Sequence, residues 1–377
     1  MRVISADSHV LEPPDLWTRR LAAGRFADRA PRVDRDPKTE AHRFLIDGLA
    51  PQPISLPGAA GKASEELRET GSIDDARAGG WDLDARLADQ DLDGIAAEIL
   101  YPSISMAITQ LTDVDYELAC AQAYNDWLSE LCSRAPERVA GIALVPTHDV
   151  DAAVSEVVRT HDAGLRGVLV PGRPSAGHYA EPRFDPLWAA CAERWLPVSF
   201  HIALTGDPVG DPTLGSGIRM MTVMSVVQVM QQTLSLFIFG GVFDRHLDLR
   251  VVSAEHDAGW VAHYAYRLDQ LFERHRHWLS TDVAIRRRPS DYVATNAYFT
   301  FQKDPVAVET RDRVGVTQLM WASDYPHSDS TWPHSRKVIE RDFGGVPDDE
   351  LALLVGGNAE ALYELEPATS PSKSSSR

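Results

Sequence analysis

The chain has 377 residues, of which 44% are hydrophobic and 24% are charged, a composition typical of a globular protein with a sizeable core. Asp and Glu total 55 against 37 Lys and Arg, and the formal net charge of −18 disfavours nucleic acid or an anionic membrane surface as a partner. The three cysteines, Cys120, Cys132 and Cys191, lack metal-binding or disulfide-framework spacing, and no apolar run is long enough to span a membrane, so we expect a cytoplasmic protein.

The first apolar run, residues 3–6, predicts a buried strand that ends at Asp7. Residues 18–82 are rich in Pro, Gly, Arg and Asp and show little periodicity, so we expect an arm or cap inserted after this strand. A predicted helix over 84–93 follows the arm.

From residue 97 onward, strand-like and helix-like segments alternate. Further strands are predicted at 97–101, 139–145, 167–170, 197–200, 249–254, 297–301 and 319–322. Helices are predicted at 115–134, 150–163, 186–195, from about 220 to the Gly240-Gly241 pair, and at 259–275, 306–314 and 348–363. A loop rich in Gly, Pro and Asp, 205–217, precedes the helix near 220, and we expect this loop and the arm to select the substrate.

Eight strands joined by helical sequence are typical of the α/β class and of a (β/α)8 TIM barrel, whose active site lies at the carboxyl ends of the strands. We expect one barrel domain over residues 1–366, with the inserted arm over 18–82 and a helical C-terminal segment. Residues 367–377 form a Ser- and Lys-rich segment that we expect to be a disordered tail.

Imidazole and carboxylate side chains recur where these strands end. The strand-end segments are Asp7-Ser8-His9, His201, Glu255-His256-Asp257 and Asp324-Tyr325-Pro326-His327. Alternate residues of a strand point to the same face, so Asp7 and His9 could reach one ion. Mixed nitrogen and oxygen ligands suit Zn, Mn or Fe(II), and the ion would activate a water or polarise a substrate oxygen. Glu255 and His256 are equally well explained as ligands or as supporting residues, and His327 either orients a substrate carboxylate or caps the next segment.

The chain resembles the amidohydrolase-related family of the metal-dependent hydrolase superfamily, which includes carboxymuconate-semialdehyde decarboxylase and the resorcylate-type decarboxylases. The segments that carry the resemblance are 4–13, 86–91, 200–201, 255–260, 321–327 and 356–359. The resemblance implies a first-strand ligand pair at Asp7 and His9, a fifth-strand ligand at His201, and a metal-binding carboxylate that also handles a proton at Asp324. It also implies a homodimer.

The number of ions stays open on the sequence alone. Binuclear relatives carry a bridging carbamylated Lys on the fourth strand, and residues 167–171 contain no Lys, which favours one ion per chain. Two ions bridged by a carboxylate are the alternative.

We therefore predict a metal-dependent enzyme that hydrolyses or non-oxidatively decarboxylates a small organic, carboxylate- or acyl-bearing metabolite. The predicted metal ligands are Asp7, His9, His201, Glu255 and Asp324, and the predicted catalytic residues are Asp324, His256 and His327. Zn or Mn is the favoured ion and Fe the alternative. An iron or di-iron oxygenase on the same barrel is the competing hypothesis, and a binding protein without catalysis is a third class, which the complete ligand set disfavours.

Overall fold

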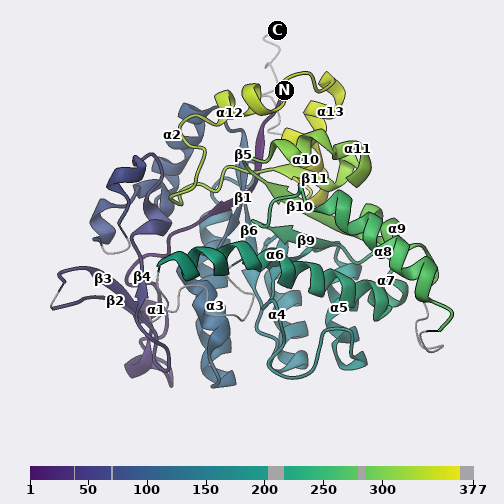
Figure 1. The fold of residues 1–377 in the computed structure, drawn as a ribbon. Coiled ribbons are helices and arrows are strands. Elements are labelled where there is room, and N and C mark those ends of the chain that lie inside the picture. Colours follow the sequence, from purple (N-terminus) through teal and green to yellow (C-terminus); the bar gives the residue numbers. More distant parts are fainter. Residues whose placement is uncertain (38, 69–70, 203–215, 279–284, 366–377) are drawn as a thin grey trace, which may run out of the picture.

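The computed structural model describes residues 1–37, 39–68, 71–202, 216–278 and 285–365, with only the backbone of 216–223. Parallel strands stand in the centre of the molecule with helices around them (Figure 1). The eight strands of this sheet follow the order β1-β5-β6-β7-β8-β9-β10-β11. Their bounds are β1 Ile4–His9, β5 Ala97–Tyr101, β6 Val139–Leu144, β7 Gly167–Leu169, β8 Val198–His201, β9 Val251–Ala254, β10 Ala297–Phe301 and β11 Leu319–Trp321.

The two edges of this sheet approach one another just beyond β11. The backbone N–H of Asp324 donates to the carbonyl of Asp7 at 2.9 Å, and the N–H of His9 donates to the carbonyl of Tyr325 at 2.6 Å. The sheet is therefore a nearly closed parallel barrel, and the predicted TIM-barrel fold is confirmed.

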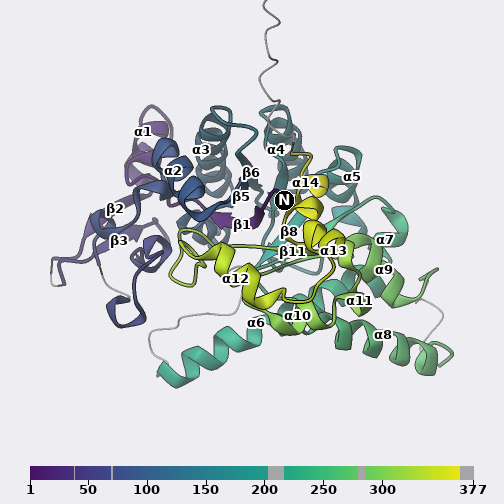
Figure 2. The ribbon, with the colours of Figure 1, turned by 90° about the horizontal axis from the view of Figure 1, so that it is seen from above.

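Helices cover the outside of the barrel, and Figure 2 shows α3, α4 and α5 beside one another around the strands. The helices are α1 Leu16–Arg20, α2 Leu83–Asp93, α3 Val114–Cys132, α4 Val150–Asp162, α5 Asp185–Glu193, α6 Ser216–Phe239, α7 Val242–Arg245, α8 Val261–His275, α9 Pro289–Asn296, α10 Pro305–Glu309, α11 Arg311–Val314, α12 Ser335–Asp342, α13 Asp348–Ala352 and α14 Asn358–Leu362. Asp82, Asp113 and Asp149 each accept a backbone N–H of the first turn of α2, α3 and α4, which fixes where these helices begin.

The segment after β1 contains a separate antiparallel sheet, β2 Arg32–Arg35, β3 His42–Leu45 and β4 Gln52–Pro53. Short 3-10 turns follow it. They are η2 Leu56–Gly58, η3 Ser64–Glu66, η4 Ile73–Asp75 and η5 Ala78–Gly80. Figure 1 shows β2 and β3 beside the barrel, outside its ring of helices. The sequence predicts an inserted arm here, and the domain limits 1–366 and 18–82 stay predictions.

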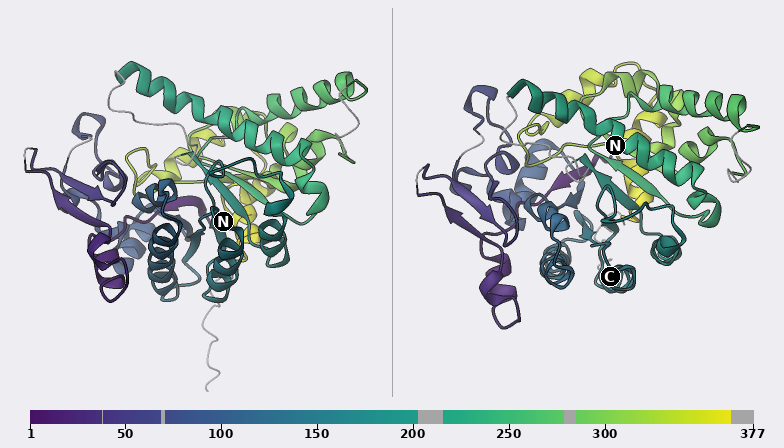
Figure 3. Two further views of the ribbon diagram at one scale, coloured as in Figure 1. Left: turned by 90° about the horizontal axis from the view of Figure 1, so that it is seen from below. Right: turned by 60° about the horizontal axis from the view of Figure 1, so that its bottom comes forward.

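The long helix α6 starts at Ser216, slightly before the predicted start, and Gly241 with a φ of 71° follows its end. Figure 3 shows α6 extending past the barrel toward the side on which β2 and β3 lie. Most of the predicted loop 205–217 and the predicted tail 367–377 lie outside the described residues. Within the described parts of the chain, no helix is long and apolar enough to cross a membrane.

Several predicted boundaries are wrong. β1 runs on to His9, past the predicted end at Asp7, with a register shift between Ser5 and Ser8. The predicted helix 306–314 is two helices, because Thr310 leaves the helical region with a ψ of 12°. The predicted helix 348–363 contains a π-helical turn over Leu353–Gly357. Helices α9 and α12 were not predicted, since each is only about two turns long, which gives a short window for a helical period.

Candidate metal centre

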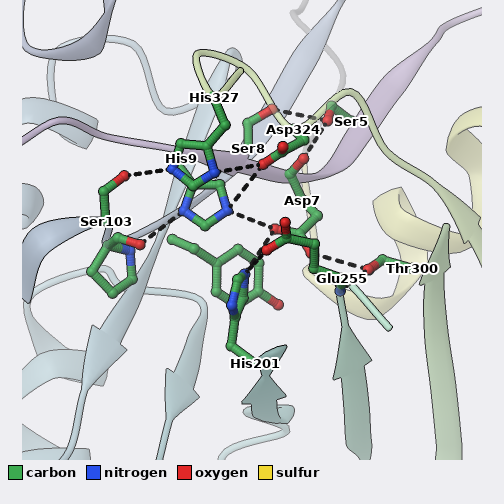
Figure 4. A network of polar contacts seen from close by, with 12 residues as sticks. Ser5, Asp7, Ser8, His9, Ser103, His201, Glu255, Thr300, Asp324 and His327 are labelled. Carbon is green, nitrogen blue, oxygen red and sulfur yellow. Dashed lines mark hydrogen bonds and ion pairs between the residues drawn. The ribbon is translucent and has the colours of Figure 1, made fainter. Parts of the chain in front are cut away.

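The first strand supplies two side chains to one point inside the barrel. Asp7 and His9 are both fully buried at the end of β1. His9 Nε2 lies 3.5 Å from Asp7 Oδ1. Figure 4 shows both side chains turned toward His201, Glu255 and Asp324. We call these five side chains, Asp7, His9, His201, Glu255 and Asp324, the candidate centre.

The ring of His9 has a fixed tautomer. Its Nδ1 lies 2.8 Å from the carbonyl oxygen of Pro102, an acceptor, so Nδ1 carries the proton. The lone pair of Nε2 is then free and faces the candidate centre. A backbone carbonyl that holds the far nitrogen of a histidine in this way is a common support for a metal ligand.

Thr300, at the end of β10, fixes the carboxylate of Asp7. Its hydroxyl donates to Asp7 Oδ2 at 3.0 Å and accepts the backbone N–H of Glu255 at 2.8 Å. Only Oδ1 of Asp7 is left for another partner. The Thr300 hydroxyl therefore connects Asp7 of β1 to Glu255, which follows β9.

His201, the last residue of β8, and Asp324, after β11, complete the cluster. His201 Nε2 lies 3.7 Å from Asp7 Oδ1, and His9 Nε2 lies 3.4 Å from Asp324 Oδ1. These separations are too long for hydrogen bonds, but they suit atoms that surround a common ion.

Unpartnered polar atoms gather at this point. Within the part of the chain that the structure describes, the following buried atoms have no hydrogen-bond partner: Asp7 Oδ1, His9 Nε2, both ring nitrogens of His201 and both carboxylate oxygens of Asp324. Buried polar atoms normally have partners, because an unpaired one costs about 1–3 kcal/mol. A set of imidazole nitrogens and carboxylate oxygens that face one another fits a divalent cation.

Two overlapping groups of ligand atoms lie within 4.8 Å of one another: Asp7, His9 and His201, and His9, Glu255, Asp324 and His327. Glu255 Oε2 approaches His201 Nε2 to 3.2 Å. His327 Nδ1 lies 2.9 Å from Asp324 Oδ1 without the angle of a hydrogen bond, and its Nε2 lies 2.8 Å from the hydroxyl of Ser103.

Glu255 and Asp324 have left-handed backbones, with φ values of 60° and 56°. This conformation is costly for residues other than glycine and is often found at functional sites. Both residues follow a barrel strand, β9 or β11, and their carboxylates belong to the same group of neighbouring ligand atoms.

Burial and crowding shift the pKa values of the cluster. Burial alone would raise the pKa of Asp7, but His201 and His9 outweigh it and hold that pKa well below its usual range. Burial, and then the charge of His327, lowers the pKa of His9 to about 3, so its ring is neutral as a metal ligand must be. Burial and then Asp324 raise the pKa of Glu255 to about 8, and burial and then Asp7 raise that of Asp324 well above its ordinary value. A cation among these carboxylates would relieve their mutual repulsion.

A cavity of about 390 Å³ opens beside the candidate centre. Asp7, Glu255 and His256 are among its lining residues, together with Val226 and Val227 of α6. Burial and then His201 lower the pKa of His256 to about 3. Its Nδ1 is 3.3 Å from the hydroxyl of Ser253. His256 lines the cavity but belongs to neither group of neighbouring ligand atoms.

The structure thus brings together all five residues predicted as ligands and places His327 against Asp324, with His256 in the cavity wall. Sequence reasoning missed Thr300 and the Pro102 carbonyl as supports, because their roles depend on contacts between distant strands. Thr300 stands at a strand end, so its position was a signal that could have been used. Glu12 also supports the site: it accepts the backbone N–H groups of Ser103 and Ser105, which shapes the loop that carries the Pro102 carbonyl.

The fold and this cluster define a TIM-barrel enzyme of the metal-dependent hydrolase or decarboxylase class. The sequence profile of the amidohydrolase family matches residues 38–365. The chain belongs to the amidohydrolase family.

Known proteins of this kind are similar over most of the chain. A gamma-resorcylate decarboxylase from Rhodococcus jostii is 26% identical over 320 residues, which cover 76% of this chain and 91% of the relative. An amidohydrolase structure from Mycobacterium avium subsp. paratuberculosis has a TM-score of 0.76 at 23% identity and covers 96% of this chain and 99% of its own. A 5-carboxyvanillate decarboxylase from Novosphingobium aromaticivorans, with bound manganese, has a TM-score of 0.64 at 23% identity and covers 74% and 80%.

Proposed function

We propose that this enzyme removes CO2 from a small carboxylic acid in a reaction that depends on one divalent ion, with manganese as the favoured metal. The observation that carries the proposal is the convergence of unpartnered nitrogens and oxygens from β1, β8 and the segment after β11 beside a cavity. The decarboxylases to which the chain is similar, and the manganese in one of their structures, support this choice. These relatives lend no support to the oxygenase alternative.

Asp7, His9, His201 and Asp324 would hold the ion. A divalent ion there would supply positive charge that polarises a substrate oxygen or activates a water. Glu255 faces His201 from the cavity side, so it is the fifth candidate ligand. The neutral ring of His9 is held by the Pro102 carbonyl and the carboxylate of Asp7 by the Thr300 hydroxyl, which limits the reorganisation needed when the ion binds.

Decarboxylation replaces the C–CO2⁻ bond by a C–H bond, so one proton must reach the carbon that loses CO2. Asp324 would deliver this proton. His327 Nδ1 lies 2.9 Å from Asp324 Oδ1, and the Ser103 hydroxyl lies 2.8 Å from His327 Nε2, so these groups could return a proton to Asp324. His256 is the second acid–base candidate, since it lies in the cavity wall as a neutral ring.

The test measures the metal content of protein purified without added metal, and then the products of the manganese-loaded enzyme with hydroxybenzoic acids. We expect about one ion per chain, release of CO2 without consumption of O2, and a product lighter by one CO2. Asp324→Asn should lower the rate by about 10²–10⁴-fold, as loss of a general acid does. The exposed Asp312→Asn is the matched control and should keep full activity. The proposal is wrong if this enzyme hydrolyses esters or amides but releases no CO2 from any of the acids.

A further inference from the structure

Two residues at the cavity are not among the five side chains of the candidate centre. Gln302 and Lys303 follow β10 directly, and both line the same cavity as Asp7 and Glu255. The cavity is of a size that holds one small molecule. These two residues therefore face whatever the candidate centre acts on.

Gln302 shows that a polar group belongs in this part of the cavity. Its side chain is 8% exposed, and its Oε1 has no hydrogen-bond partner within the described residues. A buried amide oxygen without a partner is costly, so such a position is typically completed by a bound molecule.

Lys303 is the only Lys or Arg among the residues that line the described cavity. The carboxyl side chains that line the cavity with it are those of Asp257 and Asp329, which are exposed, and of Asp7 and Glu255 at the candidate centre. A lone ammonium group in an acidic cavity can select a ligand that carries negative charge away from the metal.

The present partner of Lys303 holds it weakly. Its Nζ donates to the carbonyl oxygen of Asp329 at 2.8 Å and to Oδ1 at 2.9 Å. The side chain of Asp329 is 81% exposed and that of Lys303 is 39% exposed. Exposed ion pairs of this kind contribute only about 0–1 kcal/mol to stability. An anion that enters the cavity can therefore replace Asp329 as the partner of the Lys303 ammonium group at little cost in free energy.

Part of the cavity lining is apolar. Val226 and Val227 of α6 line it, with Ile202 and Met224. A ligand with an apolar body between two charged ends matches this arrangement, with one end at the candidate centre and the other at Lys303.

We propose that Lys303 is a specificity-determining residue, which binds a second carboxylate of the substrate, distant from the carboxylate that meets the metal. A carboxylate fits better than a phosphate, because a dianion would face four acidic side chains with one lysine to balance it. This inference rests on the proposed function of the candidate centre.

The test measures binding and not turnover. Calorimetry on the manganese-loaded protein compares benzoate with isophthalate and terephthalate, which carry a second carboxylate at different ring positions. At least one dicarboxylate should bind about tenfold more tightly than benzoate, which corresponds to about 1.4 kcal/mol. Lys303→Met should abolish this difference while manganese content stays unchanged, and Lys303→Arg should retain most of it.

Lys337→Met is the matched control, because Lys337 is an exposed lysine of α12 and is not among the residues lining the cavity. It should leave the tenfold preference intact. Equal affinity of the wild type for all three probes, or a preference that survives in Lys303→Met, would overturn the proposal. If the preference depends on Lys303 but no acid releases CO2, the subsite stands and the proposed reaction fails. If the wild type releases CO2 from an acid but binds all three probes with equal affinity, the proposed reaction stands and the subsite fails.

Discussion

Thr300 determines which oxygen of Asp7 is offered to a metal. Its hydroxyl occupies Oδ2 at 3.0 Å and is itself oriented by the backbone N–H of Glu255. The carboxylate therefore keeps a single free oxygen, aimed between His9 and His201. An orienting partner of this kind is a large part of what makes a ligand set selective.

Thr300→Val keeps the shape of the side chain but removes the hydroxyl. We expect manganese affinity to fall by about 10–100-fold, because Asp7 loses its orienting partner. Titration of metal-free protein with manganese, followed by calorimetry, measures the change. Thr300→Ser retains the hydroxyl and should bind nearly as well as the wild type; equal affinity in the valine variant would show that Asp7 does not need this bond.

His201→Ala should lose manganese binding while the barrel stays folded. Both ring nitrogens of His201 lack hydrogen-bond partners in the described structure, so the substitution leaves no buried group unsatisfied. The affinity loss should exceed the about 10–100-fold cost of a supporting residue, since a ligand itself is removed. Metal analysis and circular dichroism test this, with His161→Ala as control, because His161 is a partly exposed histidine of α4 far in the chain from the predicted ligands. Full metal content in His201→Ala would remove His201 from the ligand set.

Helix α3 contacts the barrel through the buried side-chain amide of Asn125. Asn125 donates to the carbonyl of Leu144, at the end of β6, and to Glu156 of α4, and its Oδ1 accepts the N–H of Leu144. One side chain thus satisfies the backbone of the strand end and connects it to two helices. The carboxyl end of β6 is held in place where the barrel carries its functional loops.

Asn125→Ala should lower the free energy of unfolding by about 2–4 kcal/mol, because it leaves both backbone groups of Leu144 without this partner and removes one of the donors to Glu156 Oε1. Urea unfolding followed by fluorescence measures the loss. Gln122→Ala is the comparison: Gln122 lies on the same helix but makes one partly buried hydrogen bond, to Glu156. A loss no larger in Asn125→Ala than in Gln122→Ala would contradict the anchoring role.

Metal binding should stabilise the whole barrel, because the ligands come from strands far apart in the chain. β1, β8 and the segment after β11 contribute together only when the sheet is nearly closed. Manganese at about 100 times its Kd should add about 2.7 kcal/mol to the free energy of unfolding and raise the Tm by several degrees. Scanning calorimetry with and without chelator tests this. A Tm rise of the same size in His201→Ala would show that the ion binds elsewhere.

Much of the architecture follows from local patterns. Short apolar runs between helical segments located all eight barrel strands, because a strand that is buried on both faces consists almost entirely of apolar residues. The parallel order then puts every strand end on one side of the barrel, so Asp7, His9, His201 and Asp324 could be named as ligands together. The small sheet β2–β4 was not predicted, since its strands are at most four residues long and only one of their residues, Phe44, is buried.

The roles of neighbouring residues depended on the tertiary structure. Glu255 and His256 are adjacent in the chain, yet the left-handed backbone at Glu255 sends its carboxylate to the candidate centre and leaves His256 in the cavity wall. The tautomer of His9 depends on a carbonyl far along the chain, at Pro102, and the free oxygen of Asp7 depends on Thr300. Strand ends can be located from periodicity, which is a local property. The direction of a side chain beyond a strand end is set by backbone turns and by partners from other strands, and these exist only once the barrel has formed.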